Sequence, residues 1–344
     1  MTGVLKNFLH RSRVAFTDNP AQATVRVQIV DRPELADFAV ADDAHRLWIT
    51  LHHVAGDAVS LDILTAELSA CYQGLREGRT PPRASPEQSF LAWASRQHEA
   101  RRDDDLAWWS AYLRDHEALD LPTDRPRPPT PSFQGAVCRE AVTRATLEAL
   151  DAIGREAGVT RFGVLFVAWC ALMHRYTAQR DIVVGAPFHG RTTPESERVV
   201  GLFVNTLVLR CEVSGERSLR ALLAQSREGL RGAFARHDTP FDVLVERLRP
   251  PREPGRTPFF NVMFALQEPA SAPLRFGDAL TELLDTDEGT AKFDITVDVT
   301  PTADGAEVAF DFALDLFDRA TVGRMASAFV ALLDGAARDP DAPV

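Results

Sequence analysis

The most informative stretch of the chain is Leu47-Trp48-Ile49-Thr50-Leu51-His52-His53-Val54-Ala55-Gly56-Asp57. Every second residue among the first five is aliphatic, and this period of two predicts a β-strand. The same period places His53 at the end of the strand on its aliphatic side and turns His52 to the opposite side. Gly56 then permits a tight turn, and Asp57 follows four residues after His53.

Two interpretations of His53 and Asp57 are open at this point. An imidazole close to a carboxylate suits a base that must be held in one orientation, because imidazole changes its charge near neutral pH. The alternative is structural. Apolar residues recur at helical spacing over residues 59–75, so Asp57 would be the N-cap of a helix. The spacing alone does not choose between the two.

The composition excludes several classes of protein. Apolar residues make up 45% of the chain and charged residues 25%, which are ordinary proportions for a folded globular domain. The formal net charge of −11 argues against a nucleic-acid surface, which needs a basic footprint. The four cysteines show no CxxC spacing, so buried free thiols are expected. No membrane span or signal peptide is evident, and we expect a cytoplasmic chain.

Two proline-rich connectors organise the chain. The first, residues 79–86, contains three prolines and predicts a boundary between an N-terminal lobe, 1–82, and a C-terminal lobe, 83–344. The second, residues 121–129, is too stiff for a helix or a central strand. Residues 267–289 have no clear periodicity, and we expect them to form a bridging segment, or latch, from the second lobe to the first.

The predicted helices and strands do not follow a regular βαβ order, which favours an α/β fold of the α+β kind with mixed sheets. Helices are expected near 59–75, 145–156, 161–176, 218–236, 240–249 and 319–336, with one or two more within 90–117. Strands are expected near 24–30, 47–53, 137–142, 181–187, 202–210, 259–266, 293–299 and 308–312. The helix at 161–176 is apolar nearly all round and should lie in the core.

Five motifs follow one another along the chain. They are His52-His53-Val54-Ala55-Gly56-Asp57, the segment 121–135 with Leu-Pro-Thr-Asp-Arg-Pro, Val200-Gly201-Leu202-Phe203-Val204-Asn205-Thr206 ending at Arg210, His237-Asp238-Thr239-Pro240-Phe241, and the strand 256–264. In this order they resemble the condensation domains of nonribosomal peptide synthetases, within the chloramphenicol acetyltransferase-like superfamily that carries HHxxxD. The family's opening motifs are absent, so the first lobe is expected to be truncated. Ala58 replaces the family's usual glycine, which is acceptable if that position needs no positive φ.

The resemblance implies a two-lobed fold with a tunnel between the lobes. It also implies an acyltransferase that joins a donor acyl or peptidyl thioester to an acceptor aminoacyl amine in antibiotic or other secondary-metabolite biosynthesis. Both substrates would arrive on the phosphopantetheine arms of upstream and downstream carrier proteins, and the chain itself would bind no cofactor. A monomer that binds neither nucleic acid nor membrane is expected. No metal is expected, because strand alternation turns the two histidines to opposite faces.

The resemblance places the catalytic set at His53, His52 and Asp57. We expect His53 to be the base, or the group that positions the amine, and His52 to pack structurally. Asp57 is expected to pair with an arginine of the second lobe, with Arg191 as the candidate. The structural or tunnel residues are Gly56, Arg191, Asn205 and Asn261, although an amide in a strand motif often satisfies backbone groups instead.

Two other functions are compatible with the sequence. One is an acyltransferase of the same superfamily that uses soluble acyl-CoA with an alcohol or amine acceptor. The other is a condensation-like domain without chemistry that recruits a tailoring enzyme. Such domains usually have a damaged HHxxxD motif, whereas both histidines and Asp57 are present here.

Overall fold

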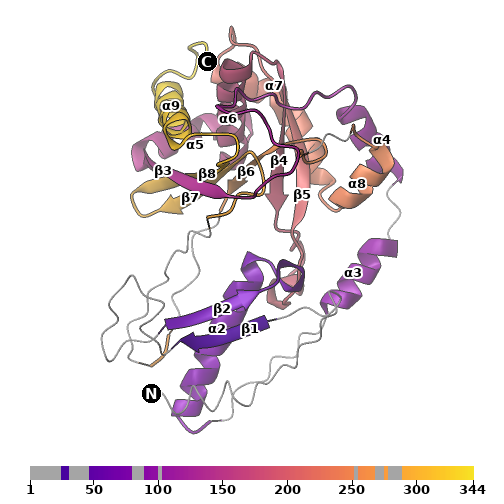
Figure 1. The fold of residues 1–344 in the computed structure, drawn as a ribbon, viewed down its shortest axis with the longest axis vertical. Helices are drawn as coiled ribbons and strands as arrows, with labels where there is room; N and C mark the ends of the chain where they lie inside the picture. The colour runs from indigo at the N-terminus through magenta and orange to yellow at the C-terminus, as the bar shows by residue number, and fades with distance from the viewer. Residues whose placement is uncertain are drawn as a thin grey trace. The chain divides into compact units, whose positions relative to one another are not determined.

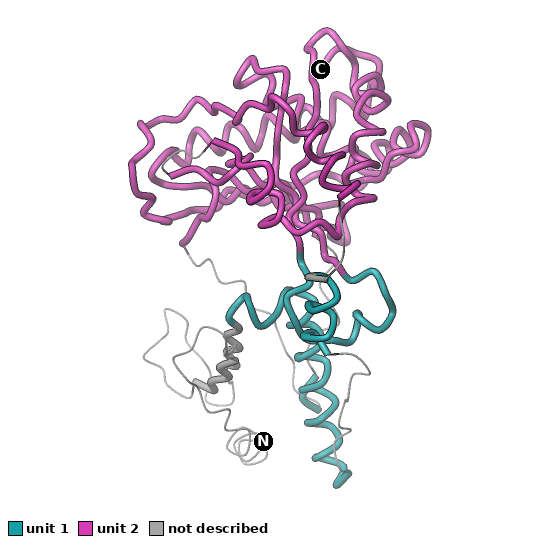
Figure 2. Tube along the Cα trace, turned by 90° about the vertical axis from the view of Figure 1, so that its right-hand side faces the viewer, with its two compact units in different colours: residues 1–100, 191–204, 270–284 teal, residues 101–190, 205–269, 285–344 magenta. Residues whose placement is uncertain are grey.

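The structure is a computed structural model of the chain. It describes residues 25–30, 46–79, 89–99, 103–251, 255–267, 275–277 and 289–344, with the backbone alone for 25–30, 46–51 and 98–99. The chain divides into two compact units, coloured separately in Figure 2. Unit 1 comprises residues 1–100, 191–204 and 270–284, and unit 2 comprises 101–190, 205–269 and 285–344.

Unit 2 is built on a six-stranded mixed sheet in the order β3-β8-β7-β6-β4-β5 (Figure 1). The strands are β3 (Gly135–Thr143), β4 (Asp181–Phe188), β5 (Asn205–Glu212), β6 (Val262–Leu266), β7 (Ile295–Thr302) and β8 (Gly305–Ala313). β6 runs parallel to both β4 and β7, and the remaining neighbours are antiparallel. The expected α/β fold with a mixed sheet is therefore confirmed.

The helices of unit 2 are α4 (Asp103–Tyr112), α5 (Arg144–Ala157), α6 (Arg161–Thr177), α7 (Leu219–Ala235), α8 (Phe241–Leu248) and α9 (Arg319–Arg338). α6 is the core helix that its sequence predicts, with every residue from Gly163 to Met173 buried. Its Trp169 ring packs on Phe310 of β8 and Phe329 of α9 at centroid distances of 5.9 and 5.7 Å. Among the described helices none alone meets the length and hydropathy of a membrane span. Only the pair α5 and α6, bent by 101°, does so together.

The edge strand β5 is covered by the end of α4. The Tyr112 hydroxyl donates to the carbonyl of Arg210 at 3.0 Å and accepts from the amide of Arg210 at 2.8 Å. In return, the Arg210 guanidinium donates to the carbonyls of Tyr112 and Arg114 at 2.7 and 2.9 Å. Tyr112 thus occupies hydrogen-bonding groups that an edge strand would otherwise present to another chain.

Unit 1 contains an antiparallel pair, β1 (Val25–Val30) and β2 (Arg46–Leu51), in which Val25 pairs with Leu51. A 3₁₀ turn (His53–Ala55) leads into α2 (Ala58–Arg76), and α3 (Phe90–Glu99) follows. Two segments that are distant in sequence also belong to unit 1. Residues 191–204 lie between β4 and β5 in the chain, and part of 270–284 packs on α2.

The described part of the predicted bridging segment, 275–277, belongs to unit 1. The ring of Phe276 meets Tyr72 of α2 edge to face at 5.1 Å, and the amide of Arg275 donates to the hydroxyl of Ser69 at 3.0 Å. Residues on either side of 270–284 belong to unit 2, and the bridging role of the whole segment stays a prediction. The rest of 267–289, apart from Gln267 and Gly289, lies outside the described residues.

Three boundaries differ from the sequence prediction. The units do not divide at residue 82, because α3 packs through Phe90 and Trp93 on Phe203, at 5.3 and 4.6 Å, within the segment that joins unit 1. β2 ends at Leu51, so strand alternation does not orient the two histidines. β5 begins at Asn205 rather than at residue 202, because residues up to 204 belong to unit 1.

Candidate functional site

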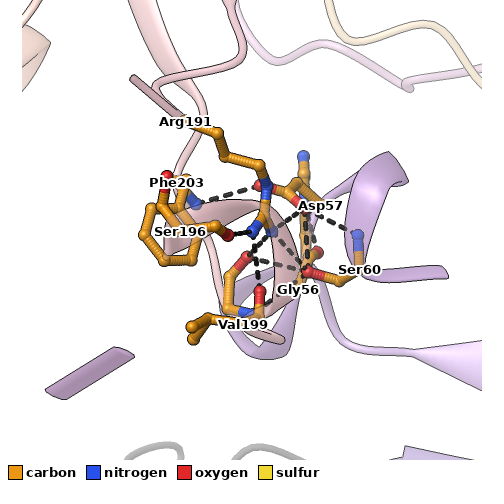
Figure 3. A network of polar contacts seen from close by, with 9 residues as sticks. Gly56, Asp57, Ser60, Arg191, Ser196, Val199 and Phe203 are labelled. Carbon is orange, nitrogen blue, oxygen red and sulfur yellow. Dashed lines mark hydrogen bonds and ion pairs between the residues drawn. The ribbon is translucent and has the colours of Figure 1, made fainter. Parts of the chain in front are cut away.

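The centre of the site in unit 1 is the Asp57 carboxylate, which begins α2 (Figure 3). One oxygen accepts from the Ser60 amide at 2.9 Å, from the Ser60 hydroxyl at 2.8 Å and from Arg191 Nη2 at 2.8 Å. The other oxygen accepts from the Phe203 amide at 3.0 Å. One carboxylate therefore caps α2, as the structural interpretation predicts, and also pairs with Arg191, as the resemblance implies.

Arg191 is held by acceptors from its own segment as well as by Asp57. Its guanidinium donates to the carbonyls of Ser196, Val199 and Gly201, the last two at 2.7 and 3.3 Å. The Phe203 ring lies under it, 4.2 Å from the guanidinium carbon. With only 2% of its side chain exposed, Arg191 fastens residues 196–203 to the start of α2. Although Arg191 was expected in the second lobe, it belongs to unit 1, because its segment crosses over.

Ser60 is part of this network, and sequence analysis missed it. Its hydroxyl lies 3.0 Å from Arg191 Nη2 and 3.0 Å from the Gly201 amide, and 2.9 Å from the Gly201 carbonyl. The side chain is fully buried. The only signal in the sequence was its position three residues after the N-cap, where a side chain can reach back to the cap.

The pKa of Asp57 reflects these contacts. Burial acts to raise the pKa, but the hydrogen bonds from Arg191, from the hydroxyl and amide of Ser60 and from the Phe203 amide outweigh it. The net effect is a pKa below the ordinary value for aspartate. Asp57 is therefore ionised at neutral pH. All the partners described for it are protein donors, which suits a structural carboxylate rather than a proton donor.

His53 begins the turn that connects β2 to α2, and its side chain is exposed. Its Nδ1 lies 3.1 Å from the carbonyl oxygen of Gly56. Because a carbonyl oxygen can only accept, this contact places the proton of the neutral ring on Nδ1 and leaves a lone pair on Nε2. His53 thus has the form that a proton acceptor needs. Its position relative to a cavity between the lobes stays a prediction.

His52 is the N-cap of the same turn and is also exposed. Its Nδ1 accepts from the amide of Val54 at 3.2 Å. An amide N–H can only donate, so Nδ1 of His52 carries no proton and the proton of the neutral ring lies on Nε2. The expected structural packing of His52 is replaced by a cap on the turn.

The glycine and alanine of the motif do not need unusual backbone. Gly56 is buried and has a φ of 179°, which is extended backbone open to any residue, so a tight glycine turn is not what places it there. Ala58 is the first residue of α2 and is not among the described residues with positive φ. Alanine therefore fits where the family usually has glycine.

Asn205 and Asn261 both lie in unit 2 and satisfy polar groups there. The Asn205 amide nitrogen donates to the carbonyls of His237 and Thr239, both at 2.7 Å, and its oxygen accepts from the amides of Thr206 and Phe241 at 2.9 and 3.1 Å. These contacts leave Asn205 little capacity to bind a substrate.

Asn261 is 3% exposed, and its amide nitrogen donates to the Leu119 carbonyl at 3.2 Å and to Asp294 at 2.6 Å. Asp294 also pairs with Arg127 through both oxygens. The role of Asn261 is therefore to join three segments of unit 2. In the part of the chain that the structure describes, no group of three or more His, Cys, Asp or Glu side chains could hold a metal ion.

A family model described as the condensation domain matches residues 31–344 of this chain. The chain belongs to the condensation domain family. Curated relatives carry similar sequence. Tyrocidine synthase 2 of Brevibacillus parabrevis is 34% identical over 306 residues, which cover 88% of this chain and 8% of that protein. Phosphinothricin tripeptide synthetase PhsB of Streptomyces viridochromogenes is 36% identical over 317 residues, 89% of this chain and 26% of the relative.

Two solved structures show the same fold. The complex of the X-domain and OxyB from teicoplanin biosynthesis matches this condensation domain with a TM-score of 0.79 and 26% identity, covering 92% of this chain and 71% of that chain. The first condensation domain of the calcium-dependent antibiotic synthetase, in complex with a substrate analogue, matches with a TM-score of 0.71 and 21% identity, covering 99% and 73%. The resemblance to condensation domains of nonribosomal peptide synthetases is therefore confirmed, and this condensation domain spans a small part of its curated relatives.

Proposed function

We propose that this condensation domain forms an amide bond between a donor acyl or peptidyl thioester and an acceptor aminoacyl amine. Both substrates would be bound to phosphopantetheine on separate carrier proteins, and the chain itself would need no cofactor. The observation that carries the proposal is the state of His53. Its ring is anchored through Nδ1 to Gly56, so Nε2 is available as a proton acceptor in a chain of the condensation family.

The proposed reaction needs one base. The acceptor amine attacks the thioester carbonyl carbon, and His53 Nε2 accepts the proton that the nitrogen loses. The tetrahedral intermediate then collapses, the carbon–sulfur bond breaks, and the leaving thiolate takes a proton from the imidazolium. Proton transfer to a positioned base of this kind contributes about 10²–10⁴-fold to a rate.

The buried pair of Asp57 and Arg191 supports the site without joining the chemistry. Asp57 begins α2 directly after the turn, so its contacts fix the end of the turn whose start carries His53. Gly56, the acceptor for His53 Nδ1, is the residue next to Asp57. The network therefore fixes the backbone on which the orientation of His53 depends.

The test is a condensation assay with purified donor and acceptor carrier proteins. His53→Ala should lower the rate by about 10²-fold or more and leave the melting temperature unchanged, since the side chain is exposed. His189→Ala, which removes an exposed histidine of unit 2, is the matched control and should keep the rate. Near wild-type condensation by His53→Ala would reject the assignment. Replacing the acyl carrier by acyl-CoA in the same assay separates this function from a CoA-dependent acyltransferase.

One observation favours a second candidate, recruitment of a tailoring enzyme. The neighbour that is 26% identical was solved as a complex of the X-domain and OxyB. Under this alternative the chain would bind a tailoring enzyme encoded beside it, and His53→Ala would not affect that binding. Binding without condensation would support recruitment, whereas condensation that depends on His53 would support the enzyme.

A further inference from the structure

The two adjacent histidines of the motif are held in opposite tautomers. His52 Nδ1 receives a proton donor, the amide of Val54 at 3.2 Å, whereas His53 Nδ1 faces a proton acceptor, the Gly56 carbonyl at 3.1 Å. The neutral rings therefore differ, with the proton on Nε2 of His52 and on Nδ1 of His53. This difference gives the two residues different tasks.

We propose that His52 is a positioning residue for His53, and that it acts only while its ring is neutral. The neutral ring caps the turn by accepting from Val54. A protonated ring carries hydrogen on both nitrogens, so it cannot accept from an amide in either ring orientation. Protonation of His52 would therefore release the cap and loosen the turn that carries His53. The inference rests on the proposed function only in what it says of the rate.

The start of the turn depends on this cap, because the network around Asp57 fixes only the end of the turn. Its three residues include no buried side chain. Its backbone bonds run from the Ala55 amide to the His52 carbonyl at 2.7 Å and from the Gly56 amide to the His53 carbonyl at 3.3 Å. One hydrogen bond contributes about 1 kcal/mol net, which changes the ratio of the ordered to the loosened turn by about fivefold. Losing the cap should therefore measurably reduce the population in which His53 is correctly oriented.

Nearby charges do not replace the cap. The charged groups described next to the turn are Asp57 and Arg191, and they bind each other and the surrounding backbone. Among the described contacts neither one reaches the His52 ring. Packing does not explain His52 either, because its side chain is exposed. The one described interaction of the His52 side chain is the hydrogen bond from the Val54 amide.

The first test is independent of activity. Long-range ¹H–¹⁵N spectra of the histidine rings, recorded from pH 5 to 9, report the tautomer of each ring, and His52→Asn and His53→Gln assign the signals. We expect an unprotonated Nδ1 in His52, a protonated Nδ1 in His53, and a Val54 amide signal that shifts as His52 titrates. A proton on Nδ1 of neutral His52, or a Val54 amide that does not respond to its titration, would overturn the proposal.

The second test uses two matched variants in the condensation assay. His52→Asn keeps an acceptor for Val54 that does not titrate, and asparagine is a favoured cap. His52→Leu removes the acceptor. At pH 8 we expect His52→Asn to retain the rate within about twofold and His52→Leu to lose about fivefold. A purely structural role for the ring volume would give the opposite order.

The pH profile gives the sharpest contrast. In the wild type, protonation of His52 should add a loss of about fivefold to the loss caused by protonation of His53. In His52→Asn only the loss from His53 should remain, so the ratio of the wild-type rate to the His52→Asn rate should fall by up to about fivefold as the pH is lowered. A ratio that stays constant with pH would overturn the proposal. If the wild type shows no condensation with any donor tested, the proposed function fails, and the ring spectra still decide whether His52 caps the turn.

Discussion

Asp57 and Arg191 are 134 residues apart in the chain and form an ion pair of 2.8 Å in which neither side chain is more than 7% exposed. Two charges removed from water in this way cost free energy unless hydrogen bonds satisfy their remaining groups. Here Ser60, Gly201 and Phe203 supply such bonds. The pair therefore depends on the surrounding backbone, and the start of α2 depends on the pair.

Asp57→Ala should destabilise unit 1 by about 3–5 kcal/mol, because it leaves the buried Arg191 charge without its carboxylate. Urea unfolding measures the change, and faster hydrogen exchange at the Phe203 amide would locate it. Glu77→Ala breaks an exposed pair with Arg79 and should leave stability unchanged. Equal unfolding midpoints for wild type and Asp57→Ala would remove the structural role that we assign to the carboxylate.

The contribution of Asp57 should disappear in acid. Its pKa is lowered in the folded state, so its stabilisation is complete above the unfolded value of about 4 and is lost as pH falls through the lower folded value. The difference in unfolding free energy between wild type and Asp57→Asn should be constant from pH 8 to about 5 and shrink below about pH 4. A difference that grows on acidification would contradict the direction of the pKa shift.

Tyr112→Phe should destabilise the protein and leave the backbone of the edge strand β5 less protected. Burial raises the pKa of Tyr112, so its hydroxyl stays protonated and serves both the amide and the carbonyl of Arg210. Its removal should cost about 1–3 kcal/mol and speed hydrogen exchange at the Arg210 amide. Tyr176→Phe, whose hydroxyl has no described hydrogen bond, is the control. Unchanged exchange at Arg210 would show that another group covers the edge.

Asn205→Asp tests whether the Asn205 side chain serves to satisfy backbone carbonyls or to bind a substrate. The amide nitrogen of Asn205 faces the carbonyls of His237 and Thr239, so a carboxylate would place an acceptor against two acceptors. We expect a loss of about 1–3 kcal/mol at pH 8 that becomes smaller at pH 5, where the introduced carboxyl is more often protonated. Full stability at pH 8 with reduced condensation would instead indicate contact with substrate.

Local patterns predicted most of the secondary structure. The helical stripe predicted α2, and the apolar surface of 161–176 predicted the core helix α6, because each depends on neighbouring residues alone. The pair of Asp57 and Arg191 came from the resemblance, since spacing could not connect residues 134 positions apart. The helical stripe predicted Asp57 as an N-cap and the resemblance predicted it as the partner of Arg191, and one carboxylate has both roles.

The missed features depend on contacts that a linear pattern does not contain. Ser60, Gly201 and Phe203 became part of the site only because residues 191–204 leave one unit and pack on the other. The end of β2 was placed two residues too late because the His52 ring binds the Val54 amide and starts a turn. Alternation cannot detect a side chain that bonds to its own backbone.

Because residues 191–204 belong to unit 1, the polar network around Asp57 is completed late during protein synthesis. Asp57 emerges from the ribosome 146 residues before Phe203, which is roughly 7–30 s at common rates of synthesis. During that interval the start of α2 lacks the donors of Arg191 and Phe203. Because β4 and β5 flank the crossing segment and pair at Phe188 and Asn205, their pairing brings its two ends together. Asp57 is thus made early, but the polar network around it in unit 1 is completed only after Phe203 has been made. A nascent chain stalled before Phe203 should therefore present α2 to chaperones and proteases.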